Sequence, residues 1–176
     1  EDIYSNPAIV PTPLPEMTIG GKPGVMKKID DFTVAFEFPE PYTYFVYQLA
    51  GSTGIGAGFA TRGGFQNWGG ACCPAHYLKQ FLPKYSSVEA VNKIATDQGF
   101  DNWVSLLRNK YSWALNPEVP VMTPWRTVSP INTPTWLIER NPYFWAVDTN
   151  GNQLPYIDKI TFALAVNTEV ANLRAI

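Results

Sequence analysis

The stretch that decides the fold spans Glu139 to Ile160 and reads ERNPYFWAVDTNGNQLPYIDKI. It lies between two runs with strand-like composition, at residues 136–139 and 159–166. Asn150 and Gly151 form a dipeptide that is typical of tight turns. The sequence therefore predicts two strands joined by a long connection that contains a turn.

A second pair of strands is predicted nearer the start of the chain. Apolar and polar residues alternate over residues 33–38, with the period of two that a half-buried strand shows. A further run at 25–29, joined to it by residues 30–32, completes an antiparallel hairpin.

Capping signals predict the helices that follow. Ser86 and Glu89 form a capping box before a helix over 88–97. Asp101 is expected to cap the next helix, over 102–112. Gly99 is the expected end of the first of these helices, and further helices are expected at 42–49, at 75–81 and from a cap at Thr168.

Together these elements predict an α+β fold. Its small, mainly antiparallel sheet is drawn from residues 25–38 and 136–166, with helices over 75–112 and from 168 flanking it. Residues 116–135 are rich in proline, which removes backbone donors, so we predict irregular structure there.

Composition excludes some classes of partner. The 176 residues carry a net charge of −2 and 45% apolar residues, which suits a folded single domain over 1–176. Because no basic patch is present, a nucleic-acid partner is not expected. No apolar run approaches the roughly 20 residues of a membrane span.

Four blocks of sequence resemble, in register, the large solute-binding proteins of bacterial peptide and nickel ABC importers, the family 5 extracytoplasmic receptors. Leu82 stands where a histidine is common in that family. The blocks are Glu1-Asp2-Ile3-Tyr4, the hairpin MKKIDDFTVAFEF at 26–38, the helix AHYLKQFLPKY at 75–85, and the segment at 139–160.

The resemblance implies a piece of the first lobe of a two-lobed clamp, excised from a longer protein. Residues 25–135 would form an inserted subdomain and 136–176 would return to the sheet of the lobe. It also implies capture of oligopeptides or oligosaccharides outside the membrane and delivery to a membrane permease. The implied location is periplasmic or anchored outside the membrane, the signal segment lying upstream, and neither catalysis nor a cofactor is implied.

A second hypothesis is a secreted carbohydrate-binding or carbohydrate-active domain. Six tryptophans and nine tyrosines offer flat faces on which sugars could stack. Many of these aromatics, however, fall at core-like spacings such as those of Trp103 and Tyr111.

The best candidate for a ligand surface is the glycine-rich segment over 51–70, whose length suggests a functional loop. It offers flat apolar faces beside hydrogen-bonding groups, the usual mixture in a cleft for a small polar ligand. The alternative is that these side chains pack against the rest of a parent protein. The candidate residues are Arg62, Phe65, Gln66, Asn67 and Trp68.

Two motifs suggest ligand-binding loops but lack residues that such loops need. The glycines from Gly51 onward suggest a phosphate loop, but no lysine lies between Lys28 and Lys79. The run from Asp148 suggests a calcium loop, but its sixth position is Gln153 and its twelfth is Lys159. A tight turn anchored by Asp148 is the better interpretation.

Three further chemical groups are interpreted structurally. His76 is the only histidine and lacks a nucleophile in a recognisable motif, so a surface or capping role is expected. Cys72 and Cys73 are adjacent, which favours small buried thiols over a strained disulfide or a metal site. Arg140 is expected to pair with a nearby acid or carbonyl and to fix the long connection, although its guanidinium could bind a ligand carboxylate.

Overall fold

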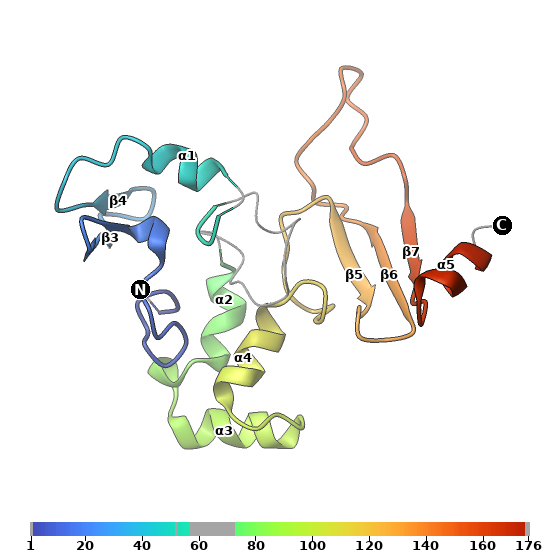
Figure 1. Ribbon diagram of the computed structural model, residues 1–176, viewed down its shortest axis with the longest axis horizontal. Coiled ribbons are helices and arrows are strands. Elements are labelled where there is room, and N and C mark those ends of the chain that lie inside the picture. Colours follow the sequence, from blue (N-terminus) through green and yellow to red (C-terminus); the bar gives the residue numbers. More distant parts are fainter. Residues whose placement is uncertain (1, 52, 57–72, 175–176) are drawn as a thin grey trace. The chain divides into compact units, whose positions relative to one another are not determined.

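The computed structural model describes residues 2–51, 53–56 and 73–174, and it divides into two compact units. The N-terminal unit is Glu1–Tyr111 and the C-terminal unit is Ser112–Ile176. In the described residues the N-terminal unit contains two small antiparallel sheets and several helices, and the C-terminal unit contains one antiparallel sheet and the helix α5 (Figure 1). The expected assignment of 25–135 and 136–176 to parts of a larger lobe stays a prediction.

The N-terminal unit begins with short antiparallel strands. β1 (Thr18–Ile19) pairs with β2 (Lys22–Pro23), and β3 (Val25–Lys28) pairs with β4 (Val34–Glu37). The hairpin of β3 and β4 confirms the strands predicted from the alternating pattern. Its register places Val25 opposite Glu37.

An aromatic cluster holds helix α1 (Phe45–Ala50) to this hairpin. The ring of the buried Phe45 lies 4.6 Å from that of Phe38 and 4.9 Å from that of Phe36, between centroids. Offset and edge contacts at such distances stabilise aromatic pairs. Gly24 is required beside them, since a Cβ there would lie 2.4 Å from the Phe38 ring.

The helical part of the N-terminal unit contains its core. α3 contributes Val91 and Ala95, and α4 contributes Leu106 and Leu107, all four fully buried. Trp103 and Tyr111 pack against this core, as the helical spacing of the aromatics predicted. The helices are α2 (Ala75–Leu78), α3 (Val88–Asp97) and α4 (Trp103–Tyr111), with 3-10 turns at Lys79–Phe81 and Pro83–Tyr85.

The predicted capping box of α3 is wrong by one residue. Ser87, not Ser86, is the N-cap, and its hydroxyl accepts a hydrogen bond from the backbone N–H of Ala90 at 3.1 Å. Ser87 is extended and directly precedes the first helical residue, which is the geometry that a cap requires. Gly99, with φ of +80°, follows the end of the helix as predicted.

The other two predicted caps are also displaced by one position. Asn102, rather than Asp101, caps α4, because its side-chain oxygen accepts from two backbone N–H groups of the first turn at 3.0 Å. Asn167, rather than Thr168, caps α5 (Thr168–Arg174), and accepts from a backbone N–H at 2.9 Å.

The C-terminal unit is built on a three-stranded antiparallel sheet in the order β5-β6-β7. Its strands are β5 (Trp125–Ser129), β6 (Thr135–Arg140) and β7 (Lys159–Ala163). The prediction of irregular structure over 116–135 is wrong for β5. This strand contains no proline, and pairing with β6 supplies partners for its backbone.

The α+β class is confirmed, but the predicted common sheet is not found. In the described residues β3 and β4 form one sheet, and β6 and β7 belong to another that includes β5. Backbone pairing between distant segments depends on tertiary contacts that alternation alone does not specify. No helix in the described part of the chain is long and apolar enough to cross a membrane.

Candidate functional site

The predicted ligand residues Arg62, Phe65, Gln66, Asn67 and Trp68 lie outside the described residues, so the structure does not place them. The segment that leads to them, residues 53–56, is described and tightly held. The Thr53 hydroxyl donates to the Gln48 carbonyl at 2.6 Å. Gly56 is required by close packing, since a Cβ there would lie 1.9 Å from the carbonyl oxygen of Gly51.

Side chains of the protein form hydrogen bonds with both backbone groups of Gly54. Its N–H donates to the Glu16 carboxylate at 2.9 Å, and its carbonyl accepts from the Tyr4 hydroxyl at 3.1 Å. A phosphate-binding loop would leave such N–H groups available to an anion. The geometry at Gly54 therefore agrees with the rejection of a phosphate site.

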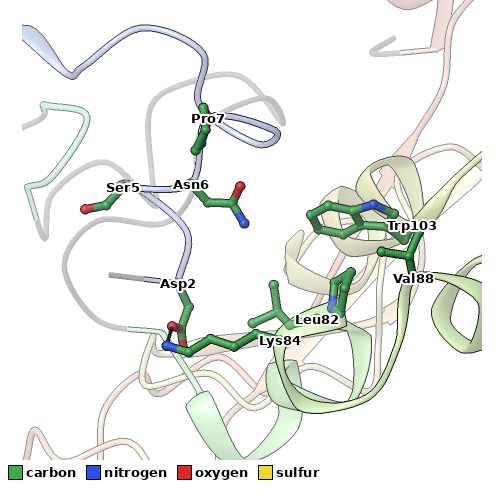
Figure 2. Close-up of a pocket in the computed structure, with 9 residues that line it drawn as sticks. Asp2, Ser5, Asn6, Pro7, Leu82, Lys84, Val88 and Trp103 are labelled. Carbon is green, nitrogen blue, oxygen red and sulfur yellow. Dashed lines mark hydrogen bonds and ion pairs between the residues drawn. The ribbon is translucent and has the colours of Figure 1, made fainter.

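A pocket of about 330 Å³ opens in the N-terminal unit (Figure 2). One side is formed by the N-terminal segment with Asn6, and the other by apolar groups that include Val88 and Trp103. Its residues come from segments about eighty positions apart in the chain, such as those of Asp2 and Lys84. The sequence alone therefore did not predict this pocket.

The charged groups of this pocket neutralise each other. Lys84 Nζ lies 2.5 Å from Asp2 Oδ1, and the Tyr85 hydroxyl donates to Asp2 Oδ2 at 2.5 Å. Partial burial acts to raise the pKa of the Asp2 carboxyl, but the hydrogen bonds from Lys84 and Tyr85 outweigh it, and the pKa is lowered. Asp2 is thus ionised at neutral pH and already paired.

The connection between β6 and β7, residues 141–158, forms a projecting segment that we call the arm (Figure 1). At its tip the Asp148 carboxylate accepts from the backbone N–H groups of Asn150 and Asn152, both at 2.8 Å. Gly151 has φ of +85°, a conformation that favours glycine. This confirms the interpretation of the calcium-like motif as a turn.

The same carboxylate links the two sides of the arm. The Tyr156 hydroxyl donates to Asp148 Oδ2 at 2.6 Å, and the Asn152 amide donates to that oxygen at 2.9 Å. The Tyr156 hydrogen bond, followed by those from Asn152, lowers the pKa of the Asp148 carboxyl well below its usual range. The partnership raises the pKa of Tyr156 in turn.

Arg140 has the predicted structural role at the base of the arm. Its guanidinium lies 3.3 Å from the Asp158 carboxylate, and its backbone N–H donates to the Asp158 carbonyl at 2.8 Å. Both ends of the arm are therefore joined where it leaves the sheet. Beside it, Arg126 of β5 pairs with Glu139 of β6.

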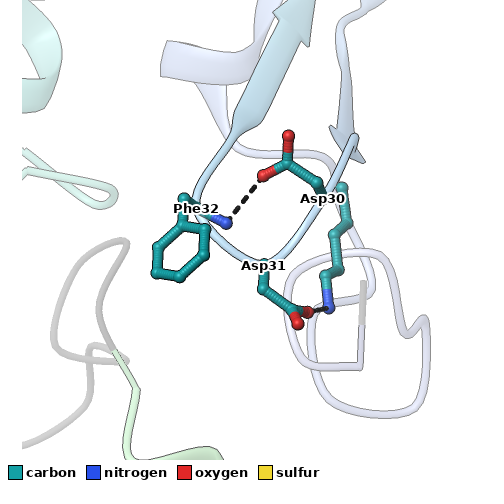
Figure 3. A network of polar contacts seen from close by, with 4 residues as sticks. Asp30, Asp31 and Phe32 are labelled. Carbon is teal, nitrogen blue, oxygen red and sulfur yellow. Dashed lines mark hydrogen bonds and ion pairs between the residues drawn. The ribbon is translucent and has the colours of Figure 1, made fainter.

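The β3–β4 hairpin carries a third polar arrangement at its tip (Figure 3). The Asp30 carboxylate accepts the backbone N–H of Phe32 at 2.7 Å, and Lys28 pairs with Asp31 at 2.5 Å. The hydrogen bond from Phe32 is the main cause that lowers the pKa of Asp30. These contacts fix a turn that leaves the Phe32 ring fully exposed.

The histidine and the described cysteine have structural surroundings. His76 is exposed on α2, as expected of a surface residue. Cys73 is half-buried against the core with its sulfur 3.9 Å from the Tyr111 hydroxyl, while Cys72 lies outside the described residues. Among the described residues no group of three metal-binding side chains gathers.

Comparison with known proteins gives no matching family model. In sequence, the chain is 28% identical over 150 residues to the periplasmic alpha-galactoside-binding protein of Rhizobium meliloti. That match spans 82% of this chain and 17% of the relative.

Two solved structures are similar to the chain. The oligopeptide-binding protein OppA matches 99% of it with a TM-score of 0.76 and 37% identity, over 24% of its own length. The periplasmic binding protein MelB from Agrobacterium fabrum, solved with stachyose, matches 82% of the chain with a TM-score of 0.51 and 27% identity, over 17% of its own length.

The chain spans about a quarter or less of the length of each of these proteins. Sequence and structure nevertheless agree in pointing to one kind of protein, and the fold matches a part of it along almost the whole chain. The resemblance of this chain to the family 5 extracytoplasmic solute-binding proteins is thereby confirmed.

Proposed function

We propose that the chain is part of the substrate-binding component of an ABC importer, which captures oligopeptides or oligosaccharides outside the membrane and delivers them to a permease. The observation that carries this proposal is the match to OppA along 99% of the chain at 37% identity. The proposed location is periplasmic or anchored outside the membrane. The three similar proteins have names that describe binding, so a carbohydrate-active enzyme is not favoured.

Such a receptor would work as a clamp. Contacts made by both lobes with the ligand favour the closed state over the open state. The permease would then recognise the closed state. A piece that spans about a quarter of the matched structure would make only some of these contacts. The 176-residue chain is therefore expected to bind ligand weakly or not at all.

The proposed ligand contacts are Arg62, Phe65, Gln66, Asn67 and Trp68. Their residue types support this choice, since aromatic faces beside amide and guanidinium groups suit both sugars and peptides.

Calorimetry on the full-length protein would test the function. Titration with stachyose, raffinose and peptides of three to five residues should show tight binding of one class, and the 176-residue chain should bind weakly or not at all. Trp68→Ala should weaken that binding at least tenfold if the aromatic face stacks on the ligand. Phe32→Ala, at an exposed hairpin tip, is the matched control and should leave it unchanged.

Three results would contradict the proposal. Tight binding of a sugar or peptide to the 176-residue chain would show a self-sufficient binding module. Hydrolysis of a glycoside would show an enzyme. Failure of the full-length protein to bind any of these sugars or peptides would exclude both classes as its ligands.

A further inference from the structure

The tip of the arm carries the only Asn-Gly dipeptide of the sequence, Asn150-Gly151. Asparagine is a thermolabile residue. Glycine after it leaves the backbone nitrogen open to reaction, because no Cβ shields that nitrogen. Asn150 is exposed, and in the described part of the chain its side-chain amide has no hydrogen-bond partner. The amide carbon of Asn150 is therefore accessible to a neighbouring nucleophile.

The folded turn holds the backbone nitrogen of Gly151 away from this reaction. The Gly151 N–H donates to the Asp148 carbonyl at 3.1 Å, and the Asn150 N–H donates to Asp148 Oδ1 at 2.8 Å. The first contact closes a β-turn, and the second forms an Asx-type turn around the same residues. While both contacts persist, the nitrogen of Gly151 keeps its proton and cannot rotate toward the Asn150 side chain.

Asp148 is in turn fixed from the other side of the arm. The Tyr156 hydroxyl donates to Asp148 Oδ2 at 2.6 Å, and the Asn152 N–H donates to Oδ1 at 2.8 Å. The Tyr156 contact ties the turn to the segment that returns to β7. Because local opening is easier where fewer contacts must break, loss of this hydroxyl should make the turn open more often.

We propose that Asn150 is a site of spontaneous deamidation and that the turn at Asp148 controls its rate. When the turn opens, the Gly151 nitrogen attacks Cγ of Asn150. A bond forms between these two atoms, the Cγ–Nδ2 bond breaks, and Nδ2 leaves as ammonia with the proton that Gly151 loses. Water then adds to a carbonyl carbon of the resulting cyclic imide, and the ring nitrogen regains a proton as its bond to that carbon breaks. The product is aspartate or isoaspartate at position 150.

The modification would weaken the turn permanently. Isoaspartate inserts a methylene into the backbone between Asp148 and Asn152, which the hydrogen bond to Oδ1 joins in the original turn. Either product also adds a carboxylate close to that of Asp148, and like charges repel. This inference concerns the arm alone and does not rest on the proposed function or on the class of ligand.

Peptide mapping by mass spectrometry of the full-length protein, incubated at neutral pH, would test the proposal. A synthetic peptide of residues 146–155, which needs no fold, gives the rate without the turn. Asn150 should convert several-fold more slowly in the protein than in the peptide. In the peptide it should convert several-fold faster than Asn152, which is followed by the bulkier Gln153.

A pair of variants isolates the role of the turn. Tyr156→Phe should speed the conversion of Asn150 several-fold and should quicken amide exchange at Gly151, because Asp148 loses a donor. Tyr143→Phe, which removes the hydroxyl of a 90% exposed side chain on the same arm, is the matched control and should change neither rate.

Conversion of Asn150 in the peptide no faster than that of Asn152 would overturn the assignment of the site. Equal rates in the protein and the peptide, or in the original protein and Tyr156→Phe, would overturn control by the turn. Failure of the full-length protein to bind sugars or peptides would bear on the proposed function and not on this inference.

Discussion

Asn141 shows how much of the local structure depends on one side chain. It is buried at the end of β6, donates to two carbonyls of the preceding loop and accepts the N–H of Tyr143. Its side chain supplies hydrogen-bond donors to loop carbonyls that have no partner strand. The Asn-Pro pair in the deciding stretch therefore has a defined physical role.

Asn141→Ala should destabilise the C-terminal unit by about 1–3 kcal/mol, because it removes from a buried position the amide that donates to the carbonyls of Val121 and Thr123. Urea unfolding followed by tryptophan fluorescence would measure the loss. The exposed Asn150 is the matched control, and Asn150→Ala should change the free energy of unfolding by far less. Equal effects of the two substitutions would contradict the assigned role.

The contact between Asp148 and Tyr156 should make the arm sensitive to pH at both extremes. The pKa of Asp148 is lowered in the folded arm, so its stabilisation is present above the ordinary carboxyl pKa of about 4 and is lost as pH falls through the lowered value. The pKa of Tyr156 is raised, so its stabilisation is present below about 10 and is lost as pH rises through the raised value.

A carbon-13 NMR titration of the Asp148 carboxyl would check this prediction. Tyr156→Phe removes the hydroxyl and should move the pKa of Asp148 back toward its ordinary value. Tyr143→Phe, which removes the hydroxyl of a 90% exposed side chain on the same arm, is the control and should leave the pKa unchanged. A Tyr156→Phe titration that superimposes on the original curve would refute the link.

At the scale of elements, the helices α3 and α4 are correctly predicted, but their N-caps are not. The prediction of α4 also rests on apolar residues at helical spacing over several turns, so one displaced cap residue does not change it. The prediction of α3 rests on its capping signals, and the error there is one residue. A cap depends on the φ and ψ of a single residue. Adjacent candidates such as Ser86 and Ser87 are equivalent in sequence and differ only in backbone conformation.

The two candidate caps of α4 make this difference measurable. Asn102→Ala should cost about 1 kcal/mol of stability, because two N–H groups of the first turn lose their acceptor. Asp101→Ala should cost less than half of that. Urea unfolding of both variants would decide, and a larger loss for Asp101→Ala would restore the cap predicted from the sequence.

At the scale of the whole molecule, buried apolar side chains are concentrated in one of the two units. The cluster on α3 and α4 belongs to the N-terminal unit. In the C-terminal unit, the described residues with a buried apolar side chain are Ala114, Val119 and Ile138. Local stability follows buried contacts of this kind.

Amide hydrogen exchange of the 176-residue chain should therefore be slowest in α3 and α4, around Val91 and Leu106, and faster in β7. Mass spectrometry of peptic fragments would resolve the two regions. Slower exchange in β7 than in α4 would contradict this order.

The sequence by itself determined the family resemblance, the α+β class, the β3–β4 hairpin, the helices α3 and α4, and the turn at Asp148. These features depend on residues close together in the chain, whose periodicity and turn chemistry are visible in it. The candidate ligand residues around Trp68 were also chosen from the sequence and stay a prediction.

Only the tertiary structure decided the separate sheets, the strand β5 and the pocket beside Asp2 and Trp103. It also showed that Tyr143 and Trp145 are exposed while Trp103 packs against a core, although all three are aromatic residues in apolar runs. The physical reason is that pairing and burial depend on which distant segments meet, and this depends on the packing of the whole chain.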